Sequence, residues 1–181
     1  MENVPRRMRP AAKPSEYYVN QRVGIFIDVQ NLYHSAKNLY HGRVNYSELI
    51  KYLVRGRQLI RSLAYVVKSE TAEGEASFFE ALEKAGLELR MKDLQIYAGG
   101  MKKADWDVGM AVDAIRMASF LDVVILVTGD GDFLPLVDYL KWGQGRFVEV
   151  AAFHRSASGK IQEAADRFIN IEDIPRAIMR K

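Results

Sequence analysis

Short apolar runs rich in β-branched residues alternate with longer stretches of helical periodicity along most of the chain. The runs predict strands at 23–28, 59–67, 87–92, 123–128 and 146–153, with a short sixth at 167–170. The periodic stretches predict helices at 31–40, 46–54, 73–85, 105–120, 133–142 and 160–166. This alternation is typical of a parallel sheet with helices on its faces, so we predict an α/β fold.

Two details of the pattern refine this prediction. The apolar runs at 24–27 and 123–127 are uninterrupted, which is typical of strands covered on both faces. Gly86 and Gly143 stand just past two predicted helices, where a left-handed residue often ends the helix. We therefore expect a mainly parallel sheet of five or six strands between two helical layers.

Composition limits the class of protein. The 181 residues correspond to about one domain, and 49% of them are hydrophobic, which is enough for a full core. The absence of cysteine excludes disulfide frameworks, thiolate zinc sites and cysteine nucleophiles. No apolar run approaches the roughly 18 residues of a membrane span, and no signal peptide is recognised. We expect a cytoplasmic protein without membrane contact.

The charge is unevenly distributed, although the sequence pI is ≈ 9.0. The first 22 residues contain five basic and two acidic residues, and the rest contains 21 of each. Three of the five prolines also lie in this leader. We predict a flexible basic N-terminal arm at 1–20, a domain at 21–175 and a basic C-terminal end at 176–181. The arm is either a solubilising tail or a segment that contacts phosphates.

Acidic residues follow the predicted strands and begin one helix. Asp28 ends the first strand, and Asp130 and Asp132 follow the fourth. Ligands of such sheets bind at the carboxyl ends of the strands, so these side chains should share one edge. The helix at 105–120 adds Asp105 and Asp107 from its first turn, where acids also complement the helix dipole.

Carboxylates that converge in this way repel one another unless a cation is bound. Oxygen ligands without histidine or cysteine favour Mg²⁺ or Mn²⁺ over zinc. Mg²⁺ is usually held by one or two carboxylates together with a substrate phosphate, and it can activate water for hydrolysis. The residues therefore predict a metal-dependent phosphodiesterase.

Several competing motifs are absent from the sequence. There is no Gly-x-x-x-x-Gly-Lys-Ser/Thr loop of a P-loop NTPase and no Gly-x-Ser-x-Gly elbow of a serine hydrolase. Gly143-Gln144-Gly145 follows a predicted helix, which does not fit a dinucleotide fingerprint. The first strand ends in Asp28-Val29-Gln30, whereas a haloacid-dehalogenase-like phosphatase would have Asp-x-Asp there.

Five segments in this order resemble the NYN domains of the LabA-like group, within the PIN-like nuclease superfamily. They are FIDVQN at 26–31, KADWDV at 103–108, AVDA at 111–114, TGDGDF at 128–133 and ADRFI at 165–169. The similarity extends over about residues 22–173 and excludes the arm. It implies a three-layer α/β/α, PIN-like or Rossmann-like fold with a Mg²⁺-dependent ribonuclease site.

The resemblance also implies roles for particular residues. The metal ligands and catalytic acids would be Asp28, Asp107, Asp130 and Asp132. Asn31 would accompany Asp28, and the Thr128 hydroxyl would hold a carboxylate or a phosphate. The match assigns no role to Asp105. Asp113, which lies about 120° around the helix from Asp107, is either a supporting residue or a solvated side chain.

Other residues are weaker candidates for substrate contact. Lys102 and Lys103 precede the acids, and His154 and Arg155 follow the fifth strand. Tyrosines at near-helical spacing could stack on unpaired bases or pack against the core, and arginines after the second helix could form a basic patch. These two sets are Tyr33, Tyr40, Tyr46 and Tyr52, and Arg55, Arg57 and Arg61.

Three functions are consistent with the sequence. The first hypothesis is a Mg²⁺- or Mn²⁺-dependent endoribonuclease whose partner is RNA, with DNA not excluded. The second is a regulatory module that keeps the pocket and binds RNA or protein with weak catalysis. The third is a phosphatase or nucleotidase for a small substrate. A homodimer is possible in each case.

Overall fold

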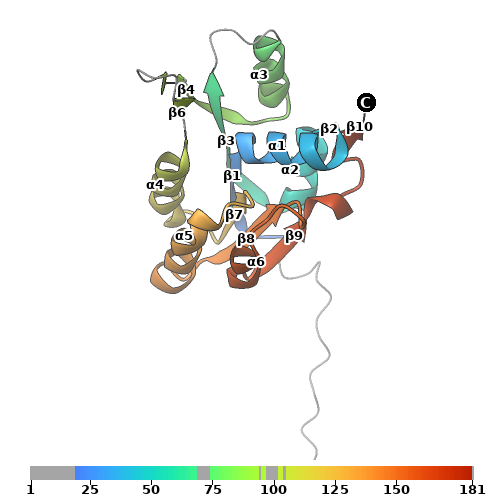
Figure 1. Cartoon of the computed structure of the whole chain (residues 1–181). Coiled ribbons are helices and arrows are strands. Elements are labelled where there is room, and N and C mark those ends of the chain that lie inside the picture. The colour runs from blue at the N-terminus through green and yellow to red at the C-terminus, as the bar shows by residue number, and fades with distance from the viewer. Residues whose placement is uncertain (1–18, 69–73, 94, 97–101, 104, 181) are drawn as a thin grey trace, which may run out of the picture.

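A six-stranded sheet runs through the computed structural model, which describes residues 19–68, 74–93, 95–96, 102–103 and 105–180 (Figure 1). The strand order is β4-β3-β1-β7-β8-β9, and every neighbouring pair is parallel. This confirms the prediction of a mainly parallel sheet. The strands are β1 (Arg22–Asp28), β3 (Gln58–Lys68), β4 (Glu88–Asp93), β7 (Val123–Val127), β8 (Phe147–Ala152) and β9 (Arg167–Asn170).

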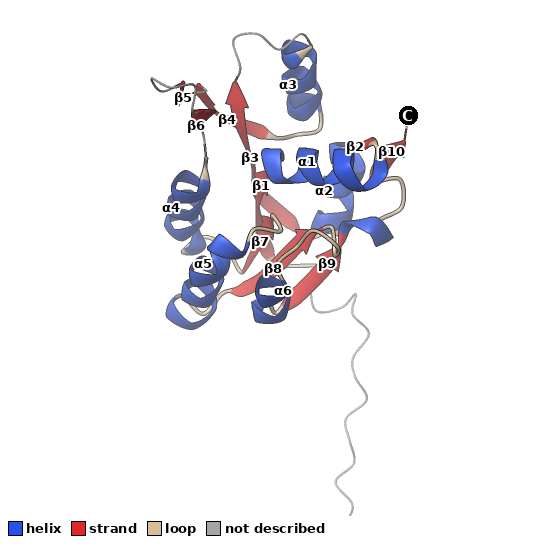
Figure 2. Ribbon diagram, viewed as in Figure 1, coloured by secondary structure: helices blue, strands red, loops and turns tan. Residues whose placement is uncertain are grey.

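Helices cover both faces of this sheet, so the predicted three-layer α/β/α arrangement is also confirmed (Figure 2). On one face lie α1 (Val29–Tyr40) and α2 (Tyr46–Val54), with α3 (Glu75–Lys84) near the edge formed by β3 and β4. On the other face lie α4 (Asp107–Ala118), α5 (Leu134–Asp138) and α6 (Gly159–Ala164). The core is therefore divided into two clusters by the sheet.

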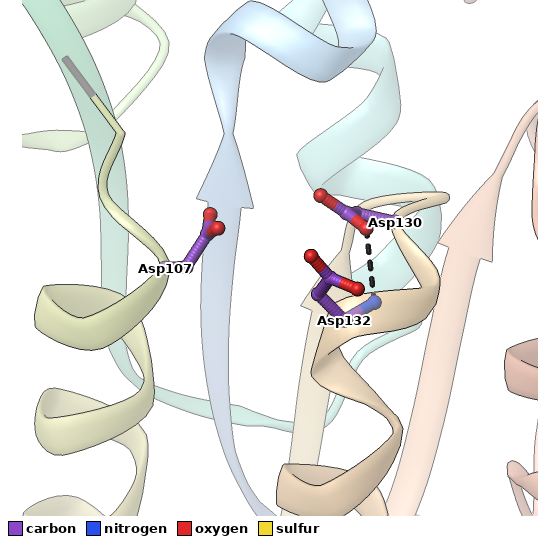
Figure 3. Close-up of side chains that lie close together, drawn as sticks. All are labelled: Asp107, Asp130 and Asp132. Atoms are coloured by element: carbon purple, nitrogen blue, oxygen red, sulfur yellow. Dashed lines mark hydrogen bonds between the residues drawn. The ribbon is translucent and has the colours of Figure 1, made fainter. Parts of the chain in front are cut away.

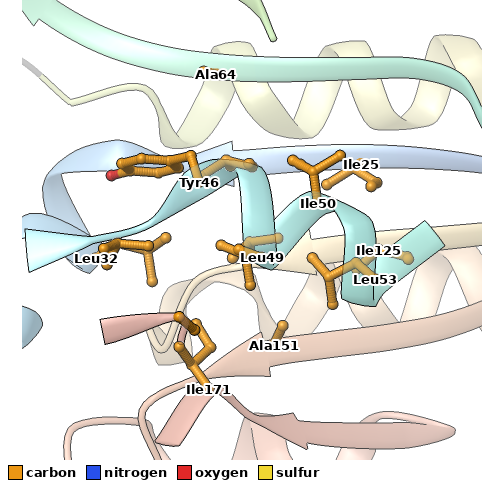
Figure 4. Close-up of a cluster of buried hydrophobic side chains, with 14 of the residues drawn as sticks. Ile25, Leu32, Tyr46, Leu49, Ile50, Leu53, Ala64, Ile125, Ala151 and Ile171 are labelled. Carbon is orange, nitrogen blue, oxygen red and sulfur yellow. The ribbon is translucent and has the colours of Figure 1, made fainter. Parts of the chain in front are cut away.

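The alternation of side chains along the central strands supplies both clusters. Ile25 of β1 and Ile125 of β7 face α1 and α2, and Figure 4 shows them packed against Leu49 and Leu53 of α2. Phe26, one position along β1, faces the other helical layer. A strand covered on both faces must be apolar at every position. This is why β1 and β7 appear in the sequence as continuous apolar runs.

Two small antiparallel pairs were not predicted. β2 (Gly42–Val44) pairs with β10 (Ile178–Arg180), and β5 (Gln95–Ile96) pairs with β6 (Lys102–Lys103). Strands of two or three residues are too short to show a period in the sequence. The predicted C-terminal end is thus partly a strand that closes over the start of α2.

The predicted helix at 133–142 is wrong in detail. The chain forms a 3₁₀ turn η1 (Gly131–Phe133), then α5, then a π-helical turn η2 (Tyr139–Gly143). Of the two glycines predicted to end helices, Gly86 has the expected left-handed backbone, with φ of 87°. Gly143 does not, and Gly145 adopts that conformation instead. The π-helical turn extends the helical segment to Gly143, so the left-handed glycine lies two residues later than predicted. A further 3₁₀ turn, η3 (Ile171–Asp173), follows β9.

The structure does not support a basic patch of Arg55, Arg57 and Arg61, which the sequence had left open. Arg57 is buried and ion-paired with Glu149, with 2.9 Å between its Nη2 and Oε2. Arg61 pairs with Glu88, and the Arg55 guanidinium lies 4.3 Å from the centre of the Tyr52 ring. The predicted arm falls almost entirely outside the described residues. Among the described residues no helix is long and apolar enough to cross a membrane.

Candidate metal centre

Asp28 joins β1 to α1 at the point where the strand order of the sheet reverses. It ends β1, and its Oδ1 accepts a hydrogen bond from the backbone N–H of Asn31 at 3.0 Å. This hydrogen bond caps the start of α1. The Thr128 hydroxyl donates to Oδ2 at 3.3 Å. Burial raises the pKa of the Asp28 carboxyl, while these hydrogen bonds oppose the change. Asp28 is thus a fixed, half-buried acid at the edge where ligands of such sheets bind.

The loop after β7 carries the next two acids. The Asp130 amide donates to Thr128 Oγ1 at 3.2 Å, and the Asp132 amide donates to Asp130 Oδ1 at 2.9 Å. Asn31 Oδ1 accepts from the Gly129 amide at 3.0 Å, which fastens the loop to α1. Gly129 is required by packing, because a Cβ there would lie 2.9 Å from the backbone of Ala157. The loop is therefore held from two sides.

The start of α4 supplies acids from the opposite side. Asp107 is the first residue of α4, and its neighbour Trp106 donates from Nε1 to the Val66 carbonyl of β3 at 2.8 Å. The Trp106 ring lies against Gly109, where a Cβ would come within 2.6 Å of it. This packing fixes where Asp107 lies relative to the sheet.

The structure brings Asp107, Asp130 and Asp132 together. One carboxylate oxygen from each lies within 4.8 Å of the others. Figure 3 shows Asp107 pointing from α4 across the end of β1 towards the two acids of the β7 loop. Burial raises the pKa of Asp107, and the nearby charges of Asp130, Asp105, Asp28 and Asp132 raise it further.

These residues fit a divalent cation. Among the described residues no ion pair neutralises Asp28, Asp107, Asp130 or Asp132. Each carboxylate oxygen has free lone pairs, and an oxygen-only donor set suits Mg²⁺ or Mn²⁺. A cation between the three oxygens would remove the repulsion that raises the pKa of Asp107.

The acids open into a pocket of ≈ 210 Å³, which we call the acid pocket. Asp28, Asp107 and Asp130 line it, as does Asp105, whereas Asp132 lies at its exposed rim. The sequence did not indicate four further lining residues, which are Gln30, His34, Tyr65 and Trp106. Tyr65 is opposite Asp28 in the register of β3 and β1, and that register cannot be read from the sequence.

Asp113 supports the pocket from behind. The Tyr65 hydroxyl donates to Asp113 Oδ2 at 3.0 Å, and Arg90 Nε lies 3.3 Å from the same oxygen. Asp113 is not one of the three clustered acids. It orients the ring of Tyr65, which forms part of the pocket wall.

Two of the weaker candidates for substrate contact lie elsewhere. His154 and Arg155 do not line the acid pocket: His154 packs its ring against Phe168, and Arg155 pairs with Glu172 at 3.4 Å. Both follow β8, one strand beyond β7. The backbone of Lys102 and Lys103 forms β6, and their side chains lie outside the described residues, so their contact with substrate stays a prediction.

Comparisons with known proteins show what the chain resembles. The NYN domain family matches residues 22–172. The low amplitude and bright protein LabA of Synechococcus elongatus is 24% identical over 161 residues, which cover 84% of this chain and 85% of LabA. A crystal structure of VPA0982 from Vibrio parahaemolyticus, a protein of unknown function, superposes with a TM-score of 0.82 at 30% identity. That alignment covers 89% of this chain and 98% of the Vibrio chain.

Proposed function

The chain belongs to the NYN domain family, whose members are generally nucleases, and on this basis we propose that it is a metal-dependent ribonuclease. The reaction is hydrolysis of RNA phosphodiester bonds at the acid pocket. The observation that carries the proposal is the group of three carboxylates, Asp107, Asp130 and Asp132, which two separate elements bring within 4.8 Å.

The residues divide into two roles. Asp107, Asp130 and Asp132 would hold Mg²⁺ or Mn²⁺, with Asp28 within reach of the same pocket. When bound, such a cation lowers the pKa of a coordinated water and shields the charge on the leaving oxygen. Thr128 and Asn31 do not need to touch the metal, because they hold Asp28 and the β7 loop in place. Tyr65 and Trp106 limit the access of water from the β3 side.

The distribution of charge supports a polyanionic substrate. Outside the first 22 residues, basic and acidic residues are equal in number at 21 each. The five acids of the site are part of that balance, so the remainder of the domain has 21 basic and 16 acidic residues. A cation-filled pocket within a positively charged surface attracts phosphates on both sides of the bond that is cleaved.

A direct cleavage assay tests the proposal. End-labelled RNA and DNA of the same sequence are incubated with the full chain and Mg²⁺, Mn²⁺ or EDTA. We expect cleavage of RNA with either metal and none with EDTA. Asp130→Asn should reduce the rate by about 10²-fold or more, while the Asn side chain can still accept the Asp132 amide and keep the loop intact.

The matched control is Asp138→Asn, which removes an exposed acid on α5 and should leave the rate unchanged. Full activity in Asp130→Asn would contradict the site assignment. Binding of RNA without cleavage would instead support the regulatory module. Hydrolysis of a mononucleotide, with intact RNA, would support the phosphatase.

A further inference from the structure

A second cavity of ≈ 810 Å³ lies beside the acid pocket. Its walls come from α1, the segment between β2 and α2, the end of β3, and α3. The side chains that characterise it are aromatic or basic: Tyr33, His34, Arg43, Tyr46, Phe78 and Phe79. We call it the aromatic groove. Its volume lies within the range of about 300–1,000 Å³ that ligand sites occupy.

The aromatic groove is continuous with the acid pocket. Gln30 and His34 line both cavities, and they are four residues apart on α1, so they lie on the same face of the helix. A strand whose scissile phosphate lies at a cation held by the acids could therefore place its neighbouring nucleotide along α1 in the groove.

The lining fits an unpaired nucleobase. Tyr33 lines the groove and is 45% exposed, so part of its side chain is accessible. The centre of its ring lies 5.5 Å from the centre of the His34 ring. Deeper in, Tyr46 and Phe78 make an edge-on contact with ring centres 6.1 Å apart. Aromatic side chains of this kind stack on the bases of single strands and tolerate any sequence. A base within a duplex is stacked between its neighbours, so its ring face is not available to the aromatic side chains of the groove.

Charge at the rim fits the phosphates of the same strand. Arg43 is exposed and makes no ion pair with any described residue. Lys37 Nζ lies 5.7 Å from the centre of the Tyr33 ring, which puts a second cation beside the proposed stacking surface. Glu75 is the acid of the lining. Two cations and an exposed aromatic ring at one rim are the elements of a single-strand binding site.

We infer that the aromatic groove binds an unpaired nucleotide that neighbours the scissile phosphate, so that the protein acts on single strands. This rests on the proposed function. The occupant is the base and phosphate of a single-stranded nucleic acid, and the groove itself does not distinguish RNA from DNA.

Fluorescence anisotropy tests the inference independently of cleavage. All proteins carry Asp130→Asn, and the probes are a labelled single-stranded RNA decamer, its DNA equivalent, and a blunt RNA duplex, each with Mg²⁺. We expect Tyr33→Ala and Arg43→Gln each to weaken binding of the single strands by about fivefold or more. Binding of the duplex should not change. The DNA decamer shows whether the 2′-hydroxyl contributes.

The controls are Trp142→Ala and Arg116→Gln, an exposed aromatic side chain and an exposed arginine outside the groove, which should bind like the parent. A decamer with 2-aminopurine should lose fluorescence on the parent by stacking and recover it on Tyr33→Ala. Parent-like binding by both groove variants, equal losses for the duplex, or no binding by the parent would overturn the inference.

The two proposals can fail separately. If the wild-type chain cleaves RNA but Tyr33→Ala has no effect on binding, the groove assignment is wrong and the nuclease stands. If binding depends on Tyr33 but the wild-type chain cleaves nothing, the groove stands and the nuclease is wrong.

Discussion

The hydroxyl of Thr128 connects two acids of the candidate site. It donates to Asp28 and accepts from the Asp130 amide, and the side chain is fully buried. Thr128→Val keeps the shape but leaves both partners without their hydrogen bond. Supporting residues of this kind typically change metal affinity or activity by about 10–100-fold. We expect a loss in that range, measured by Mn²⁺ titration calorimetry and by the cleavage assay.

Ser62→Ala is a suitable comparison for Thr128→Val. It removes another buried hydroxyl, which donates to the Gly86 carbonyl at the amino-terminal side of the sheet. Ser62→Ala should lower the free energy of unfolding by about 1–3 kcal/mol, a loss similar to that in Thr128→Val, without changing the affinity for Mn²⁺. Equal Mn²⁺ affinity in Thr128→Val and wild type would show that the hydroxyl has no part in the site.

The raised pKa of Asp107 has a consequence for stability in the absence of metal. Its folded-state pKa lies above the unfolded value of about 3.9, so the folded protein binds more protons between these two values. The contribution of Asp107 to the free energy of unfolding therefore falls as pH rises through this interval. At pH 7 in EDTA, Asp107→Asn should melt a few degrees above wild type.

Thermal scans at two pH values check this prediction. At pH 3 the carboxyl is protonated in both states, so the difference between Asp107→Asn and wild type should disappear. Asp138→Asn, on exposed α5, should match wild type at both pH values. A lower melting temperature for Asp107→Asn than for wild type at pH 7 would contradict the prediction. It would show that the ionised Asp107 carboxylate does not destabilise the folded protein.

The sequence predicted the acids of the pocket but not all of its other lining residues. Asp28 and Asp130 were found because strand ends of a parallel sheet meet at one edge, and Asp107 because it lies in the first turn of the helix before one of these strands. Tyr65 and His34 were missed for a different reason. Their place in the pocket depends on the register of β3 against β1 and on the rotation of α1, which depend on packing.

Among the elements, β8 is tied to its neighbours by a buried charge network. Glu149 of β8 accepts from Arg57 at 3.1 and 2.9 Å and from Arg167 of β9 at 3.2 Å. The carboxylate is fully buried, so its loss leaves buried arginine charge uncompensated. Glu149→Gln should lower the free energy of unfolding by about 3–5 kcal/mol in urea denaturation.

An exposed pair gives the comparison for Glu149→Gln. Glu88 pairs with Arg61 across β4 and β3, and both side chains are about half exposed. Glu88→Gln should change the free energy of unfolding by at most about 1 kcal/mol. Similar losses in the free energy of unfolding for Glu149→Gln and Glu88→Gln would show that the burial of the Glu149 network does not increase its contribution to stability.

The sequence pattern predicted the main strands and helices of the core but not the short strand pairs β2–β10 and β5–β6. The central strands β1 and β7 and the helices α1 and α2 were located because each has a buried apolar face. The helix at 133–142 was mispredicted in detail because periodicity does not reveal a π-helical turn such as η2. The burial of Arg57 could not be predicted because its partner, Glu149, lies 92 residues away in the sequence.

For the whole molecule, a bound cation would add a link between the start of α4 and the loop after β7. Asp107 begins α4, whereas Asp130 and Asp132 follow β7. Binding to the folded state alone stabilises it by about 2.7 kcal/mol at 100 times Kd. For a domain of this size, Mn²⁺ should raise the melting temperature by about 5–10 °C.

The same scan identifies the ligands. Asp130→Asn should lose most of the Mn²⁺-dependent increase in melting temperature, while Glu149→Gln should start from a lower temperature and keep the increase. An equal Mn²⁺ effect in wild type and Asp130→Asn would place the cation elsewhere. This measurement requires no substrate and is therefore independent of the identity of the nucleic acid.

Asp28 has consequences for how this kind of protein can change over evolutionary time. Its carboxylate caps α1 and holds Thr128, so its loss would damage the fold as well as the site. Asp132 is exposed, and among the described residues no side chain depends on its carboxylate for a hydrogen bond. A lineage that abandoned cleavage would then lose Asp132 early and keep Asp28 long afterwards. An intact Asp28 in a relative is therefore a poor sign of activity, and Asp132 is the better one.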